Sequence, residues 1–114
     1  MKRYTKRMHV DELRTKYDHL IGWGAGKDEF LTRYNPSLYR LDYMIDGKDN
    51  YVGEIRCGMK ISSKAILKEL VGRKICFVIY PHAEDEIVQQ IREYIEDFDI
   101  IVSKLLDYEN PITL

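Results

Sequence analysis

The sequence contains only two cysteines, Cys57 and Cys76, too few for the disulfide framework that stabilises small secreted domains. It contains no apolar run near the roughly 18–20 residues that cross a membrane. Met1 to Val10 is basic but lacks the apolar stretch of a secretory signal. The 18 Lys and Arg against 19 Asp and Glu leave a net charge of -1, without the basic surplus that nucleic-acid binding favours. We therefore expect a cytoplasmic protein with no membrane association and no nucleic-acid partner.

A chain of 114 residues has room for one hydrophobic core and not for two. Its composition, 45% hydrophobic and 32% charged, is that of a globular domain. The histidines and cysteines have no metal-ligand spacing, so no metal site is expected. No repeat or linker divides the sequence. We expect one domain over 1–114, with an N-terminal helical segment (1–18) followed by a core (19–103).

Apolar runs alternate with amphipathic segments along the chain. Residues 74–80 are apolar on both alternating faces, which is typical of a strand covered on both sides. Further strands are predicted over 19–23, 39–45 and 99–102, and helices over 10–18, 27–34, 64–70 and 84–98. Residues 51–61 could add a short strand or hairpin, with bends at Gly53 and Gly58. The alternation predicts an α/β fold: a small doubly wound parallel sheet of about four strands, a Rossmann-like three-layer sandwich.

A glycine-rich turn closes the first predicted strand and opens the next helix. Ligands of open parallel sheets bind beyond the carboxyl ends of the strands, where glycines let the backbone approach a phosphate and a helix N-terminus attracts it. At least one of Gly24 and Gly26 is expected to have φ above zero or to be too closely packed for a Cβ. The candidate ligand-binding residues in this segment are Gly22, Gly24, Ala25, Gly26 and Lys27.

Asp46 ends the second predicted strand, about 20 residues after the glycines, where an acidic residue usually holds a ribose diol. His82, after the third predicted strand, is a further candidate at the same edge, although a solvated position at the start of the last long helix is the favoured explanation. The glycine pattern is incomplete, because Glu29 stands where the third glycine of a dinucleotide site belongs. A tight turn without a ligand is the alternative interpretation.

Three segments carry a resemblance: the turn Gly24 to Lys27, Tyr43 to Lys48, and Ile61 to Ser63 before a helix. Together they resemble the N-terminal nucleotide-sugar-binding domain of bacterial sugar acetyltransferases of the sialic-acid and bacillosamine type. Related modules belong to capsule and lipopolysaccharide biosynthesis proteins and some sugar methyltransferases. The resemblance covers roughly 19–103 and implies phosphate or uridine-diphosphate contacts at the turn and a ribose or uracil contact near Asp46. Acetyl transfer is not implied, because the sequence has no hexapeptide repeat.

The sequence thus predicts a domain that binds a nucleotide or nucleotide-sugar, such as a UDP-sugar or NAD(P), in bacterial surface-sugar biosynthesis. No catalytic acid, base or nucleophile is evident, so any chemistry would need a partner protein or another domain. One alternative is an interaction module of the same fold, a protein partner or homo-oligomer subunit without ligand. The other is a truncated NAD-linked oxidoreductase, which the incomplete glycine pattern disfavours.

Overall fold

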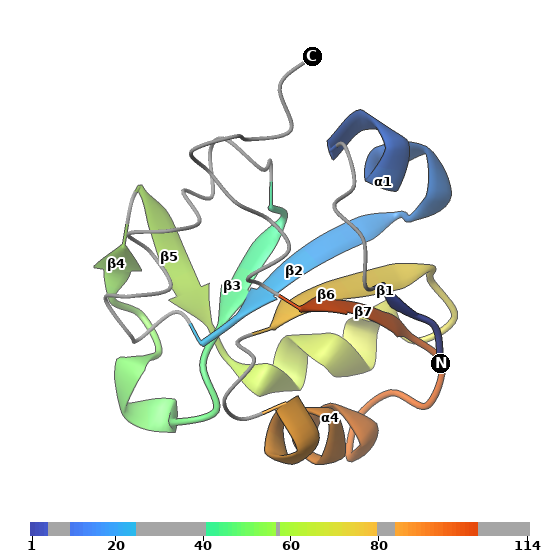
Figure 1. Cartoon of the computed structure of the whole chain (residues 1–114). Coiled ribbons are helices and arrows are strands. Elements are labelled where there is room, and N and C mark those ends of the chain that lie inside the picture. The colour runs from blue at the N-terminus through green and yellow to red at the C-terminus, as the bar shows by residue number, and fades with distance from the viewer. Residues whose placement is uncertain (5–9, 25–40, 57, 80–83, 103–114) are drawn as a thin grey trace.

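The computed structural model of the chain describes residues 1–4, 10–24, 41–56, 58–79 and 84–102, and Figure 1 shows the arrangement of their elements. The described strands are β1 (Arg3–Tyr4), β2 (His19–Trp23), β3 (Tyr43–Ile45), β4 (Ile55–Arg56), β5 (Met59–Ser62), β6 (Ile75–Ile79) and β7 (Asp99–Val102). The described helices are α1 (Val10–Lys16) and α4 (Glu84–Arg92), with 3-10 helices η1 (Asp49–Tyr51) and η2 (Lys64–Leu70). None of the described helices is long and apolar enough to cross a membrane.

The strands form one seven-stranded sheet in the order β1-β7-β6-β2-β3-β5-β4. Every pairing is parallel except that of β4 with β5. From β2 at the centre, the chain adds β3 and β5 on one side and later β6 and β7 on the other. The direction in which the sheet grows therefore reverses between β2 and β6. The carboxyl ends of β2, β3, β5 and β6 share one edge, called the carboxyl edge below, and their amino ends define the amino edge.

Helices cover both faces of the sheet, because neighbouring residues of a strand belong to different hydrophobic clusters. Leu20 packs in the cluster that contains Leu13 of α1, whereas Ile21 packs in the cluster that contains Leu67 of η2 and Ile91 of α4. This side-to-side alternation is the pleat of a strand whose two faces are both buried. Figure 1 shows α1 on one side of the sheet and η2 with α4 on the other.

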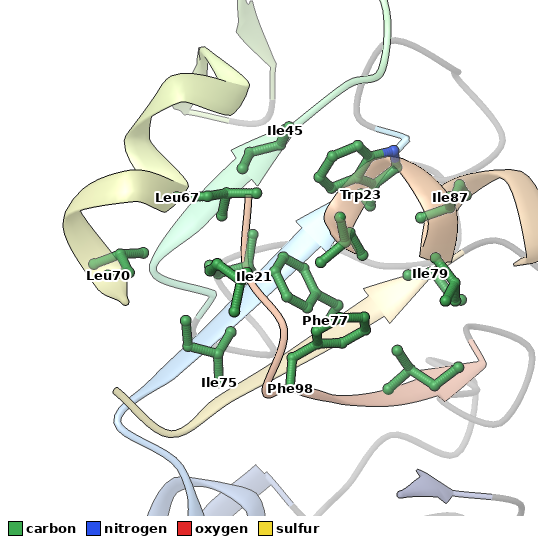
Figure 2. Packing of buried hydrophobic residues seen from close by; sticks show 14 residues of the cluster. Ile21, Trp23, Ile45, Leu67, Leu70, Ile75, Phe77, Ile79, Ile87 and Phe98 are labelled. Carbon is green, nitrogen blue, oxygen red and sulfur yellow. The ribbon is translucent and has the colours of Figure 1, made fainter. Parts of the chain in front are cut away.

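The α4-side cluster is built around aromatic rings. Trp23 and Phe77 pack edge to face with centroids 6.1 Å apart, and Phe77 and Phe98 do so at 5.5 Å. Figure 2 shows these rings between Leu67 of η2, on the left, and Ile87 of α4, on the right. Trp23 is 1% exposed, so its indole packs in the core and cannot stack on a bound base.

The four strands predicted from the sequence are all present and mutually parallel, but about four strands was too few. β1 spans two residues, too short for any periodicity, and it is recognisable only through its pairing with β7. β4 and β5 form the hairpin expected within 51–61, where Gly53 has φ 93° and Gly58 has φ 80°. β5 also pairs in parallel with β3, which no local pattern predicts.

The helices differ from their predictions in extent and type. α1 and α4 end at Lys16 and Arg92, before the predicted ends at 18 and 98. The segment 64–70 forms a 3-10 helix, capped by the Ser63 side chain, which accepts a hydrogen bond from Ala65 N. Leu67 and Leu70 are three residues apart, so a helix of three residues per turn buries both on one face. The helix predicted over 27–34 lies outside the described residues.

Candidate functional site

The polar residues of the carboxyl edge follow directly after paired strands. Trp23 of β2 and Ile45 of β3 are register partners. The next residue of each chain segment, Gly24 and Asp46, therefore lies beside the other. Gly24 lies beside the place where strand order reverses between β2 and β6, and Asp46 lies one strand further, at the end of β3. In open parallel sheets this is the crevice in which ligands bind.

Gly24 has φ 103°, a conformation that residues with a Cβ rarely adopt. Its N–H donates to the Ile45 carbonyl oxygen at 2.8 Å, which extends the pairing of β2 with β3 by one residue. Gly24 therefore ends β2 in a conformation that glycine makes accessible. The expectation of a positive φ at Gly24 or Gly26 is confirmed at Gly24.

Asp46 is 6% exposed and is the buried charged residue of the described core. Its Oδ1 accepts a hydrogen bond from Lys48 N at 2.8 Å, the two-residue reach of an Asx turn. The carboxylate thus shapes the turn that follows β3 and lies next to the glycine turn. A ligand contact at Asp46 would add to this structural role.

Two side chains reach the Asp46 turn from elements that are distant in sequence. Lys64, at the start of η2, donates from Nζ to the Gly47 carbonyl oxygen at 3.0 Å and lies 3.9 Å from Asp49 Oδ1. Gln90 of α4 lies so close that a Cβ on Gly47 would be 2.6 Å from its Oε1. That oxygen is buried and has no hydrogen-bond partner among the described residues. Sequence reasoning missed Lys64 and Gln90, because only the crossing of η2 and α4 under the sheet brings them to Gly47.

The remaining predicted site residues fall into two groups. Gly22 lies inside β2, with Met44 and Val78 as register partners on either side, so it belongs to the strand and not to the turn. The other four, Ala25, Gly26, Lys27 and His82, lie outside the described residues.

A second polar cluster lies at the amino edge, around Asp42. The Arg14 guanidinium donates to both carboxylate oxygens of Asp42, at 3.0 Å in the longer contact, and Leu20 N donates to Oδ2 at 2.8 Å. Burial by itself raises the pKa of Asp42, but the hydrogen bonds from Arg14 and Leu20 outweigh it and hold that pKa below its usual value. The cluster ties α1 to the beginning of β2. No local sequence pattern predicts this cluster, because Arg14 and Asp42 are 28 residues apart.

His19 adjoins this cluster, with Nδ1 3.8 Å from Asp42 Oδ2. Nδ1 is buried and lacks a hydrogen-bond partner within the described part of the chain. Cys76, in the centre of the sheet, is fully buried. Burial raises the pKa of its thiol, and the Asp99 carboxylate raises that pKa further, so the thiol stays protonated and is no nucleophile.

Comparison with protein-family models, curated protein sequences and solved structures found no match. Within the described ranges, no three His, Cys, Asp or Glu side chains lie close enough to hold a metal ion. The carboxyl edge therefore offers backbone amides, a buried carboxylate, a lysine and an amide side chain. Such groups can bind and orient a polar ligand.

Proposed function

We propose that this chain is a doubly wound, Rossmann-like module that binds a nucleotide or nucleotide-sugar at its carboxyl edge. The observation that carries the proposal is the adjacency of Gly24, with φ 103°, and the buried Asp46 beside the reversal of strand order. Among the parallel strands from β2 onward, the order β5-β3-β2-β6-β7 is the order 3-2-1-4-5 typical of nucleotide-binding sheets.

The chemistry of these residues predicts which part of the ligand each would contact. Backbone amides at the glycine turn and the Lys27 ammonium would contact phosphate oxygens. Asp46 would accept from sugar or base hydroxyl and N–H groups. The glycine and aspartate motifs resemble those of nucleotide-sugar modules in bacterial surface-polysaccharide biosynthesis, which makes a UDP-sugar the first ligand to test.

A thermal-shift and calorimetric comparison of UDP, a UDP-sugar, NAD, acetyl-CoA and orthophosphate tests the proposal. A ligand present at 100 times its dissociation constant adds about 2.7 kcal/mol of stability. We expect the uridine ligands to raise the melting temperature more than the others. Preference for NAD would favour the oxidoreductase alternative, and the absence of any nucleotide binding would refute the proposal in favour of an interaction module.

Two variants with matched controls locate the site. Lys27→Ala should weaken all phosphate-bearing ligands by roughly 1–3 kcal/mol, the range for a lost charged hydrogen bond, whereas Lys60→Ala on β5 should not. Asp46→Asn should weaken nucleotides more than orthophosphate. Asp49→Asn is its control, because the Asp49 side chain is 78% exposed on the same turn. Unchanged nucleotide affinity in both Lys27→Ala and Asp46→Asn would eliminate this site.

A further inference from the structure

The described structure has an open cavity of about 800 Å³ at the amino edge, on the opposite side of the sheet from the candidate nucleotide site. Its walls come from the segment that leads into β1, the end of α1, the turn before β6 and the chain between α4 and β7. In Figure 1 this is the side of the sheet where the N-terminus lies. The volume falls within the range of small-molecule sites, about 300–1,000 Å³.

Cationic side chains from three separate segments converge on this cavity: Lys2, Lys16, and the adjacent Arg73 and Lys74. The ammonium groups of Lys2 and Lys16 lie 5.1 and 5.9 Å from the centroid of the same Tyr4 ring. The Tyr4 ring attracts both ammonium groups, and both lysines line the cavity. An anion in the cavity would be attracted by both charges.

The cavity also contains acidic residues, Glu96, Asp97 and Asp99. Asp99 is already engaged, because its carboxylate accepts hydrogen bonds from the Tyr17 hydroxyl and from Lys2 N. Tyr17 in turn shares a 2.7 Å hydrogen bond with the Tyr4 hydroxyl. Burial, together with the hydrogen bonds to Asp99 and Tyr4, raises the pKa of Tyr17, so its hydroxyl remains a donor. These hydrogen bonds hold Tyr4 in place, and the ammonium groups of Lys2 and Lys16 lie near its ring.

The remaining wall is apolar. Val71 is 63% exposed and lines the cavity, so it presents an apolar surface there. Tyr94, which also lines the cavity, is half-buried, and Lys68 Nζ lies 5.9 Å from its ring centroid. The cavity thus joins an apolar surface to a paired cationic surface.

We propose that the amino-edge cavity binds a small organic anion, with its phosphate or carboxylate between Lys2 and Lys16 and its apolar body against Val71 and Tyr94. This site is separate from the proposed nucleotide site and does not depend on it. The two lysines select for charge, and the apolar wall selects for an aromatic or aliphatic body over a bare inorganic ion.

Amide NMR titrations with 1-naphthyl phosphate, 1-naphthoate and neutral 1-naphthalenemethanol test the site. We expect both anions to shift resonances of the cavity residues, and the neutral probe to bind at least tenfold more weakly. Stronger binding of the phosphate than of the carboxylate, or the reverse, identifies the preferred anion. Absence of binding, equal affinity of charged and neutral probes, or shifts confined to Gly24, Asp46 and their neighbours would overturn the proposal.

The substitutions Lys2→Gln and Lys16→Gln should each weaken the anionic probes by about tenfold, as expected for a lost charged hydrogen bond. Lys60→Gln removes an exposed lysine of β5 and serves as the matched control. All three lysines are exposed, so the melting temperatures of the three variants should remain close to that of the parent chain. Equal affinities in the three variants would show that the probes bind by general electrostatic attraction and would refute the site. UDP affinity should be unchanged in Lys16→Gln, which separates this test from that of the nucleotide site.

Discussion

At the scale of single residues, the φ of 103° at Gly24 favours glycine over any residue with a Cβ. Gly24→Ala should lower the free energy of unfolding by about 1–2 kcal/mol, because a Cβ is strained at positive φ. Urea denaturation at neutral pH measures the difference. Gly72→Ala calibrates the backbone effect alone, since Gly72 has φ 90° and a Cβ there would meet no atom within 4 Å.

A loss at Gly24 similar to that at Gly72 would assign the whole effect to backbone conformation. A larger loss would show that the glycine turn is also closely packed. No loss at Gly24→Ala would contradict the interpretation of the turn as a position that requires glycine.

The Asp42 carboxylate predicts a dependence of stability on pH. Its pKa is lower in the folded chain than in the unfolded chain, so its contribution is complete above the unfolded value of about 3.9 and is lost as pH falls through the folded value. Asp42→Asn should reduce the free energy of unfolding at pH 7 by about 1–3 kcal/mol. The difference between parent and variant should shrink below about pH 4.

Asp49→Asn is the control for this experiment, because Asp49 is exposed and its loss should alter stability little at either pH. Denaturation curves at several pH values between 2.5 and 7 provide the measurement. A difference between parent and Asp42→Asn that stays constant over this range would show that the ionised carboxylate does not stabilise the fold.

The extent to which the site was predictable differs from residue to residue. The turn at Gly24 and the position of Asp46 at a strand end follow from local patterns of glycine and charge. Gln90 does not, because a polar residue on an amphipathic helix is ordinarily solvated, and its contact with Gly47 depends on how α4 crosses the sheet. Contacts made across tertiary structure leave no periodic trace in the sequence.

At the scale of elements, α1 packs on its face of the sheet through the buried Leu13. Leu13 is 1% exposed and packs with Leu20 and Cys76. Leu13→Ala should lower the free energy of unfolding by about 2–5 kcal/mol, the range for large-to-small changes in a core. Glu12→Ala, on the exposed side of the same helix, should change it by less than about 1 kcal/mol. Equal effects in chemical denaturation would mean that α1 does not cover the sheet in solution.

Elements were predictable from the sequence where they are long and apolar. β6 is buried at all five positions, and α4 buries Ile87, Val88 and Ile91 at helical spacing, so both have clear patterns. β1 contributes one buried residue, Tyr4, which forms no pattern by itself. A strand of this length forms only through its pairing with β7, whose residues lie 97 positions later in the sequence.

At the scale of the whole molecule, Cys76 reports on the opening of the sheet. It lies in β6 between β2 and β7, is 0% exposed, and has a thiol whose pKa is raised by burial. In a Cys57→Ser background, its reaction with a thiol reagent should require unfolding of the central sheet. The free energy of opening calculated from the labelling rate should therefore equal the global free energy of unfolding.

Adding low concentrations of urea checks this equality, because global opening gives the same dependence on urea as equilibrium unfolding. Rapid labelling of Cys76 in the absence of urea, or labelling insensitive to urea, would show that β6 opens locally. Either result would be inconsistent with a central strand buried on both faces.

The pairing of β1 with β7 has a consequence for the order in which the chain acquires its structure. During synthesis on the ribosome, β1 emerges first but must wait until its partner, nearly a hundred residues later, has also emerged. Closing so long a loop is slow. Until it closes, the outer edge of β7 is unpaired and can be captured by a strand of another nascent chain. Once β1 has paired with β7, the bidentate contact of Arg3 with Glu84 also joins this strand to α4.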